Sequence, residues 1–144
     1  MDGTTLRDFV TAIIDERPWR VGLSSPRLTV EQHRSIVRAA QAHGLGDVHP
    51  ADICKAEGFR LWRANLPQRC GACRGDDIYI PVLTAEDHEA LLIHHERMHG
   101  WVYRKQSEGN EADAWWLTLA VAGESTLVPE WFRQLSENSI AFAI

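Results

Sequence analysis

The sequence has few cysteines, no excess of basic residues and no long apolar run, and each absence argues against a class of protein. Three cysteines, an odd number, do not fit a disulfide-stabilised secreted scaffold. A formal net charge of −5 argues against direct nucleic-acid binding, which needs a basic surface for phosphate contacts. No apolar stretch approaches the roughly 18 residues of a membrane span, and residues 1–5 lack the features of a signal peptide. We therefore expect a cytoplasmic protein with no membrane and no direct nucleic-acid partner.

The composition is that of one globular domain. Apolar residues make up 44% of the 144 residues and charged residues 24%, which is ordinary for a chain long enough to bury a core. We expect one domain over residues 1–144. Within it, residues 1–45 would form an N-terminal helical addition and residues 51–135 the functional core.

Apolar spacing predicts an α+β fold in which helices flank a small sheet. Thr29 and Gln32 have the spacing of a capping box at the start of a helix, and residues 59–66 alternate as a half-buried strand does. Pro81 indicates that the last strand lies at an edge or is interrupted there. We interpret the strands as a three-stranded antiparallel sheet. The expected helices are 4–17, 30–43, 50–57, 84–99, 110–122 and a short one from Pro129; the expected strands are 59–66, 70–73 and 78–83.

The residues from His95 to His99 form the pattern His-Glu-x-x-His. Positions i and i+4 of a helix share one face, so both imidazoles can reach one zinc ion. Glu96 is then placed to take the proton of a water molecule, whose pKa zinc lowers from 15.7 to roughly 7. The alternative is a surface helix with scattered histidines. Gly100 is expected to end the helix directly after His99.

A catalytic zinc site needs a third protein ligand. The metzincin pattern would require glycine at position 102 and histidine at 105, where this chain has Val102 and Lys105. The acids that follow are Glu108, Glu111 and Asp113, the last two at the start of a predicted helix. We favour Glu111 as the ligand, with Glu108 as the alternative. Asp113 is expected either to hydrogen-bond to a metal ligand and fix its orientation, or to serve as a helix-terminus acid.

From residue 51 to residue 135 the chain resembles the ImmA/IrrE family of zinc metallopeptidases. Several short signals carry the resemblance because they occur in the family's order: Glu57-Gly58, Asn65-Leu66-Pro67, Cys70-Gly71, Ile78-Tyr79-Ile80, His95 to His99, Glu111-Ala112-Asp113, and Leu127-Val128-Pro129. The resemblance implies a zincin-like fold, with Zn²⁺ held by His95, His99 and Glu111 and with Glu96 as general base. It also implies an endopeptidase whose substrate is a protein, such as a helix-turn-helix repressor cut to derepress mobile-element or stress genes. The alternative is a non-catalytic, zinc-containing binding module or the toxin-like partner of a two-gene system.

Other residues have weaker signals. Tyr103 could donate a hydrogen bond to an oxyanion, although a loop tyrosine beside Trp101 more often packs. His88 lies on the same stripe as the motif and could contact substrate. The predicted edge strand, with Ile78, Tyr79 and Ile80, could bind an extended substrate by strand addition. Cys70 and Cys73 could be half of a metal site or a redox pair, but packing is the preferred interpretation.

Overall fold

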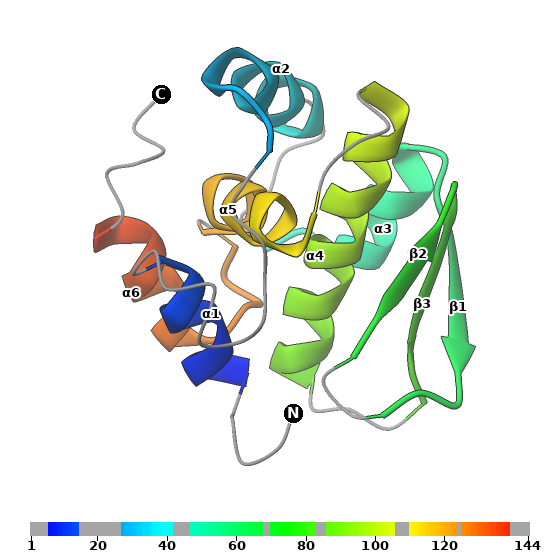
Figure 1. The fold of residues 1–144 in the computed structure, drawn as a ribbon. Helices are drawn as coiled ribbons and strands as arrows, with labels where there is room; N and C mark the ends of the chain where they lie inside the picture. Colours follow the sequence, from blue (N-terminus) through cyan, green and yellow to red (C-terminus); the bar gives the residue numbers. More distant parts are fainter. Residues whose placement is uncertain are drawn as a thin grey trace.

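The computed structural model describes residues 6–14, 27–41, 47–67, 70–82, 86–105, 110–123 and 125–138. Within these ranges the fold is mixed α and β, as predicted (Figure 1). The elements are α1 (Leu6–Ile14), α2 (Val30–Ala40), α3 (Pro50–Ala56), β1 (Arg60–Ala64), β2 (Ala72–Arg74), β3 (Asp77–Pro81), α4 (Glu86–Lys105), α5 (Glu111–Ala122) and α6 (Glu130–Asn138). None of the helices described is long and apolar enough to cross a membrane.

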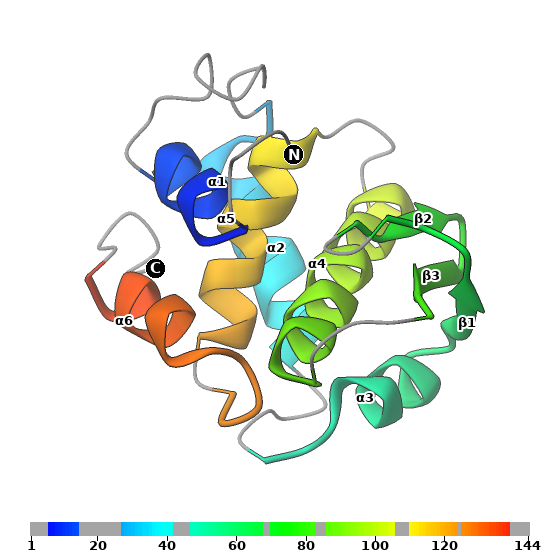
Figure 2. The same cartoon turned by 90° about the horizontal axis from the view of Figure 1, so that it is seen from below.

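Helix α4 stands at the centre of the fold, with the sheet and α3 on one side and α1, α2, α5 and α6 on the other (Figures 1 and 2). Leu91 packs in one apolar cluster with α1, α5 and α6, and Met98 packs in a second with α2 and α5. Leu92 lies in a third cluster against the sheet. A helix that is buried on several sides can hold functional side chains rigidly.

The N-terminal helices complete the core that surrounds α5. Leu6 and Val10 of α1 are buried in the cluster shared with α5 and α6. Helix α2 starts at the predicted capping box, because the Thr29 side chain accepts from the Gln32 N–H and the Gln32 side chain accepts from the Thr29 N–H. The segment expected to be an addition is thus packed directly on the helix that carries Glu111.

The expectation that α4 ends at Gly100 is wrong, because the helix continues to Lys105. A side chain at Gly100 would place its Cβ 2.4 Å from Cε1 of Phe59. Gly100 therefore serves the close approach of α4 to Phe59 rather than the end of the helix. Trp101 and Val102 extend the apolar surface of α4 by another turn, and Tyr103 lies on a helix instead of a loop.

The expectation of an antiparallel sheet is also wrong. The strand order is β1-β3-β2, in which β3 runs parallel to β1 and antiparallel to β2. The turn Gly75–Asp76 joins β2 to β3 as a hairpin, and Gly75 adopts φ +61° there. The chain between β1 and β2 crosses over, which leaves room for β3 between them. An alternating pattern sets the face of a strand but neither its direction nor its neighbours.

Strand β3 is therefore central, and the expectation that it forms an edge is wrong. Ile78 and Ile80 are fully buried, as suits a strand flanked on both sides. Pro81 ends β3, so the other part of that expectation, an interruption at the proline, is met. Strand addition is not available along Ile78 and Tyr79, because both residues pair with β1 on one side and with β2 on the other, whereas Ile80 pairs with β1.

Candidate metal centre

The structure brings His95, His99 and Glu111 together at the contact between α4 and α5. His95 Nε2 lies 3.0 Å from Glu111 Oε2, and His99 Nε2 lies 2.7 Å from Glu111 Oε1. The two imidazoles meet edge to face, with centroids 4.7 Å apart. One carboxylate therefore faces the Nε2 atoms of both histidines, with one oxygen toward each.

Glu111 reaches this position because it is the first residue of α5. Asn110 caps the helix by accepting a hydrogen bond from the Asp113 N–H, so the helix begins directly at Glu111. The Glu111 side chain remains 43% exposed, whereas those of His99 and His95 are 18% and 3% exposed. The centre is thus closed on the α4 side and accessible to solvent on the Glu111 side.

The donor atoms are suited to a zinc ion. Tetrahedral zinc with bonds of about 2.0 Å to nitrogen and oxygen has donor atoms about 3.3 Å apart. The distances of 3.0 and 2.7 Å from Glu111 are those of hydrogen bonds from the two rings, which a metal ion would replace. His95, Glu96 and His99 also form a possible metal group, each with one ligand atom within 4.8 Å of the others. We favour Glu111 over Glu96 as the third ligand because Glu111 contacts both Nε2 atoms directly.

Glu96 lies beside the histidines, almost completely buried at 4% exposure. Its side chain passes under Gly71, where an added Cβ would lie 2.7 Å from Glu96 Cγ. Burial raises the pKa of the Glu96 carboxyl, and the charges of His95 and His99 oppose the rise only in part. A buried carboxyl with a raised pKa is the type of group that exchanges protons during catalysis.

The electrostatics of Glu111 suit a ligand. Burial alone would raise the pKa of its carboxyl, but the charge of His95 and the hydrogen bonds from His95 and His99 leave that pKa well below its usual value. For His99, burial favours the neutral ring, yet the hydrogen bond and charge of Glu111 raise its pKa overall. Glu111 is therefore ionised at neutral pH, as a carboxylate ligand must be.

Helix α5 also supplies two residues that the sequence analysis missed. The ring of Trp115 stacks on His95 with centroids 3.8 Å apart and planes 18° apart. Thr118 Oγ1 lies 3.4 Å from His95 Nδ1. Both follow Glu111 at helical spacing, at i+4 and i+7, so they share its face of α5. The sequence contained a signal for Thr118, because residues 114–122 are otherwise apolar and Thr118 is the one hydroxyl residue in that stretch.

Asp113, expected to support the ligands, is engaged elsewhere. Its carboxylate accepts hydrogen bonds from the backbone N–H groups of Arg27, Leu28 and Asn110, and it lies 3.6 Å from His33. At the third position of α5 its side chain turns back to the capping residue. Asp113 is thus the helix-terminus acid of the alternative interpretation, and it anchors the start of α2 to α5.

The other candidate residues lie on α4, in or beside the sheet, or outside the part of the chain that the structure describes. Tyr103 lies one turn beyond His99 and is 51% exposed; its proposed hydrogen bond to an oxyanion stays a prediction. His88 lies near the start of α4 and is partly buried, and its contact with substrate also stays a prediction. Glu108 lies outside the described residues. Cys70 and Cys73 are both free thiols, and Cys73 packs against the cluster between the sheet and α4.

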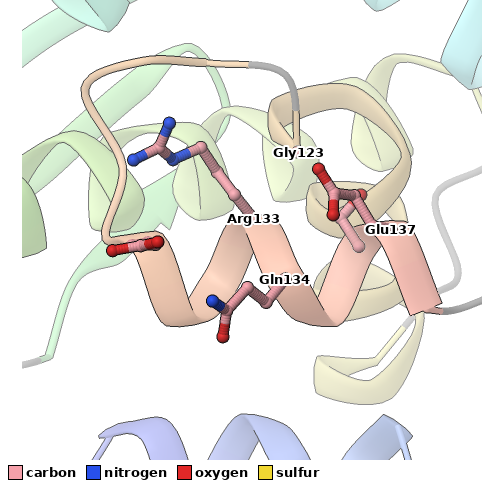
Figure 3. Close-up of a pocket in the computed structure, with 6 residues that line it drawn as sticks. Gly123, Arg133, Gln134 and Glu137 are labelled. Atoms are coloured by element: carbon pink, nitrogen blue, oxygen red, sulfur yellow. The ribbon is translucent and has the colours of Figure 1, made fainter.

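A surface hollow of about 610 Å³ lies away from this centre, on α6 (Figure 3). Polar side chains line it, including Glu130, Arg133 and Glu137, together with Gly123 just past α5. Glu111 and Gly123 lie at opposite ends of α5, which at 1.5 Å per residue puts about 18 Å between them. The hollow therefore does not belong to the metal centre.

Comparisons of the chain with protein-family models, with curated proteins and with solved structures found no match.

Proposed function

We propose that this protein is a zinc-dependent endopeptidase in which His95, His99 and Glu111 hold the metal and Glu96 is the general base. The observation that supports the proposal most is the contact of one Glu111 carboxylate with both Nε2 atoms of the His-Glu-x-x-His motif. Three convergent nitrogen and oxygen donors with one accessible side match a catalytic zinc site better than a closed structural site.

The chemistry divides between the metal and the protein. A bound zinc ion would supply Lewis-acid chemistry, polarising a peptide carbonyl and lowering the pKa of water to about 7. Glu96 would accept a proton from the attacking water and pass it to the leaving amine. The close approach of Gly71 and the burial of Glu96 limit the space in which its carboxylate can move. His95 and His99 would remain neutral and contribute their Nε2 lone pairs.

The proposed substrate is a protein. The resemblance to the ImmA/IrrE family suggests a DNA-binding helix-turn-helix repressor, cut at one site so that mobile-element or stress genes are derepressed. The partner would then be a protein segment instead of DNA, which agrees with the net charge of −5.

The proposal is tested by zinc content and by cleavage in matched variants. We expect about one zinc per chain in the wild type and in Glu96→Gln, because Glu96 does not hold the metal. Cleavage of an unfolded protein, or of repressors encoded by neighbouring genes, should be lost in Glu96→Gln. It should be retained in Glu130→Gln, a control at an exposed acid on α6.

Two results would overturn the proposal. A folded wild type that does not bind added zinc would show that the motif is not a metal site. Zinc binding together with equal effects of the wild type and Glu96→Gln on the biological target would instead favour a non-catalytic binding module.

A further inference from the structure

Thr118 is a buried hydroxyl residue in contact with a proposed metal ligand. It is fully buried on α5, and its Oγ1 lies 3.4 Å from His95 Nδ1. Its neighbours Leu117 and Leu119 are buried apolar residues of the core. A hydroxyl in such surroundings costs free energy unless it is hydrogen-bonded, so its contacts indicate what it does.

The direction of each hydrogen bond at Thr118 follows from its geometry. Thr118 Oγ1 donates its hydrogen to the carbonyl oxygen of Ala114 at 2.6 Å. A hydroxyl has one hydrogen and two lone pairs, so toward His95 Nδ1 it can only accept. The hydrogen of that contact therefore belongs to Nδ1 of His95.

A hydrogen on Nδ1 determines what the other ring nitrogen can do. In a neutral imidazole with Nδ1–H, the lone pair lies on Nε2. Nε2 lies 3.0 Å from the Glu111 carboxylate, which can only accept, so in the metal-free protein a hydrogen occupies that contact and a bound metal ion would take its place. Trp115 stacks on the same ring at 3.8 Å and limits its rotation. Helix α5 thus supplies a third ligand, a stacking ring and a hydrogen-bond acceptor, all from one face and all directed at the centre.

We propose that Thr118 is a positioning residue of the metal centre, which accepts the Nδ1–H of His95 so that Nε2 is the nitrogen available to the metal. The proposal rests on the proposed function in that it takes His95 as a zinc ligand. It goes beyond that function by assigning a role to a residue outside the motif and outside the ligand set. Acceptors behind metal-bound histidines commonly fix the ring and raise its basicity.

The test compares variants that differ in the hydroxyl. Thr118→Val keeps the shape of the side chain and removes the acceptor, whereas Thr118→Ser keeps the acceptor. The affinity for zinc is measured by competition with a chromophoric chelator, and the fold is checked by circular dichroism and thermal unfolding. We expect Thr118→Val to bind zinc about 10-fold more weakly and Thr118→Ser to remain close to the wild type.

A second measurement separates positioning from general packing. In the zinc-loaded, ¹⁵N-histidine-labelled protein, the Nδ1 hydrogen of His95 should give a slowly exchanging resonance in the wild type and in Thr118→Ser. In Thr118→Val that resonance should shift and exchange faster, because its acceptor is gone. If Thr118→Val does not fold, the pair Thr118→Ser and Thr118→Ala makes the same comparison of side chains with and without the hydroxyl.

The possible failures can be told apart. If the wild type and Thr118→Val bind zinc equally well and show the same Nδ1 resonance, the role of Thr118 is refuted while the zinc site stands. If Thr118→Ser is weakened as strongly as Thr118→Val, shape rather than the hydroxyl matters, and the inference fails. If the folded wild type does not bind zinc, the proposed function fails and this inference fails with it.

Discussion

Two neighbouring faces of α4 carry charged and polar clusters, and the clusters differ in how far their groups are exposed to solvent. On one face Arg97 is completely buried, and its guanidinium donates to the Glu57 carboxylate at 2.5 Å, to the Ala40 carbonyl oxygen at 2.5 Å and to His94 Nδ1 at 3.1 Å. On the other face His95 and His99 converge on Glu111, whose side chain is 43% exposed. The first cluster joins α2, α3 and α4 and is closed, whereas the second is accessible.

The adjacent histidines show the difference most directly. Arginine only donates, so His94 accepts at Nδ1, whereas His95 donates from Nδ1 to Thr118. Burial and the charge of Arg97 lower the pKa of His94 to about 3, which keeps its ring neutral. One residue further along the helix, His95 directs Nε2 at Glu111 and at an accessible site. Two histidines on one helix thus differ in role according to what packs against each of them.

The largest expected effect comes from breaking the closed cluster. Arg97→Met should lower the free energy of unfolding by about 3–5 kcal/mol, because Glu57 would be left as a buried charge without its partner. The double variant Arg97→Met/Glu57→Leu should regain much of that loss. Urea unfolding of the three proteins measures both values. A double variant no more stable than Arg97→Met would contradict the charge-pair explanation.

The next effect concerns the accessible cluster. Glu111→Ala should weaken zinc binding by more than about 100-fold, because it removes a proposed ligand and not only a supporting contact. The free energy of unfolding without metal should change by less than about 1 kcal/mol, since the Glu111 side chain is partly exposed. Chelator competition and urea unfolding provide the two measurements.

Asp113→Ala is the matched control for Glu111→Ala, at the same end of α5. It should lower the free energy of unfolding by about 1–3 kcal/mol, because several buried backbone N–H groups lose their acceptor, with little change in zinc affinity. If Asp113→Ala lost zinc while Glu111→Ala kept it, the assignment of the two acids would be reversed.

A smaller effect is expected at Gly71. Gly71→Ala would place a methyl group against the Glu96 side chain and displace its carboxylate. Zinc affinity should stay near the wild-type value, while cleavage falls by about 10–100-fold, as expected when a catalytic group is misplaced by about 1 Å. Ala72→Ser, at the next and exposed position, serves as the control. Unchanged cleavage in Gly71→Ala would mean that Glu96 tolerates the shift.

The smallest effect is expected at the cysteines. Burial, with a contribution from the charge of Glu96, raises the pKa of the Cys73 thiol to about 12, and burial likewise raises that of Cys54 to about 12. Metal binding and redox chemistry both require a thiolate. Iodoacetamide at pH 7 should therefore modify both residues slowly in the folded protein and rapidly in urea. Cys73→Ser should keep its zinc; loss of zinc would revive the metal-site interpretation of Cys70 and Cys73.

Much of the local structure could be predicted from the sequence. The capping box at Thr29, the end of α3 before Gly58 and the start of α5 at Glu111 all follow from short-range preferences. The three strands were predicted close to their observed positions. Their order in the sheet was not predicted, because it depends on how the chain crosses between β1 and β2. The end of α4 was missed because Gly100 is there to pack against Phe59, a contact 41 positions away in the chain that no local rule contains.

By itself the sequence determined that His95 and His99 lie on one helical face, with Glu96 next to His95, because the pitch of a helix is a local property. Only the tertiary structure decided which acid meets them. Glu111 and Asp113 are two residues apart, yet one faces the histidines and the other caps its own helix and binds the start of α2. It also decided that His95, and not His94, has its Nδ1 facing a hydroxyl acceptor. The physical reason is that the orientation and proton position of a side chain depend on neighbours that only folding brings together.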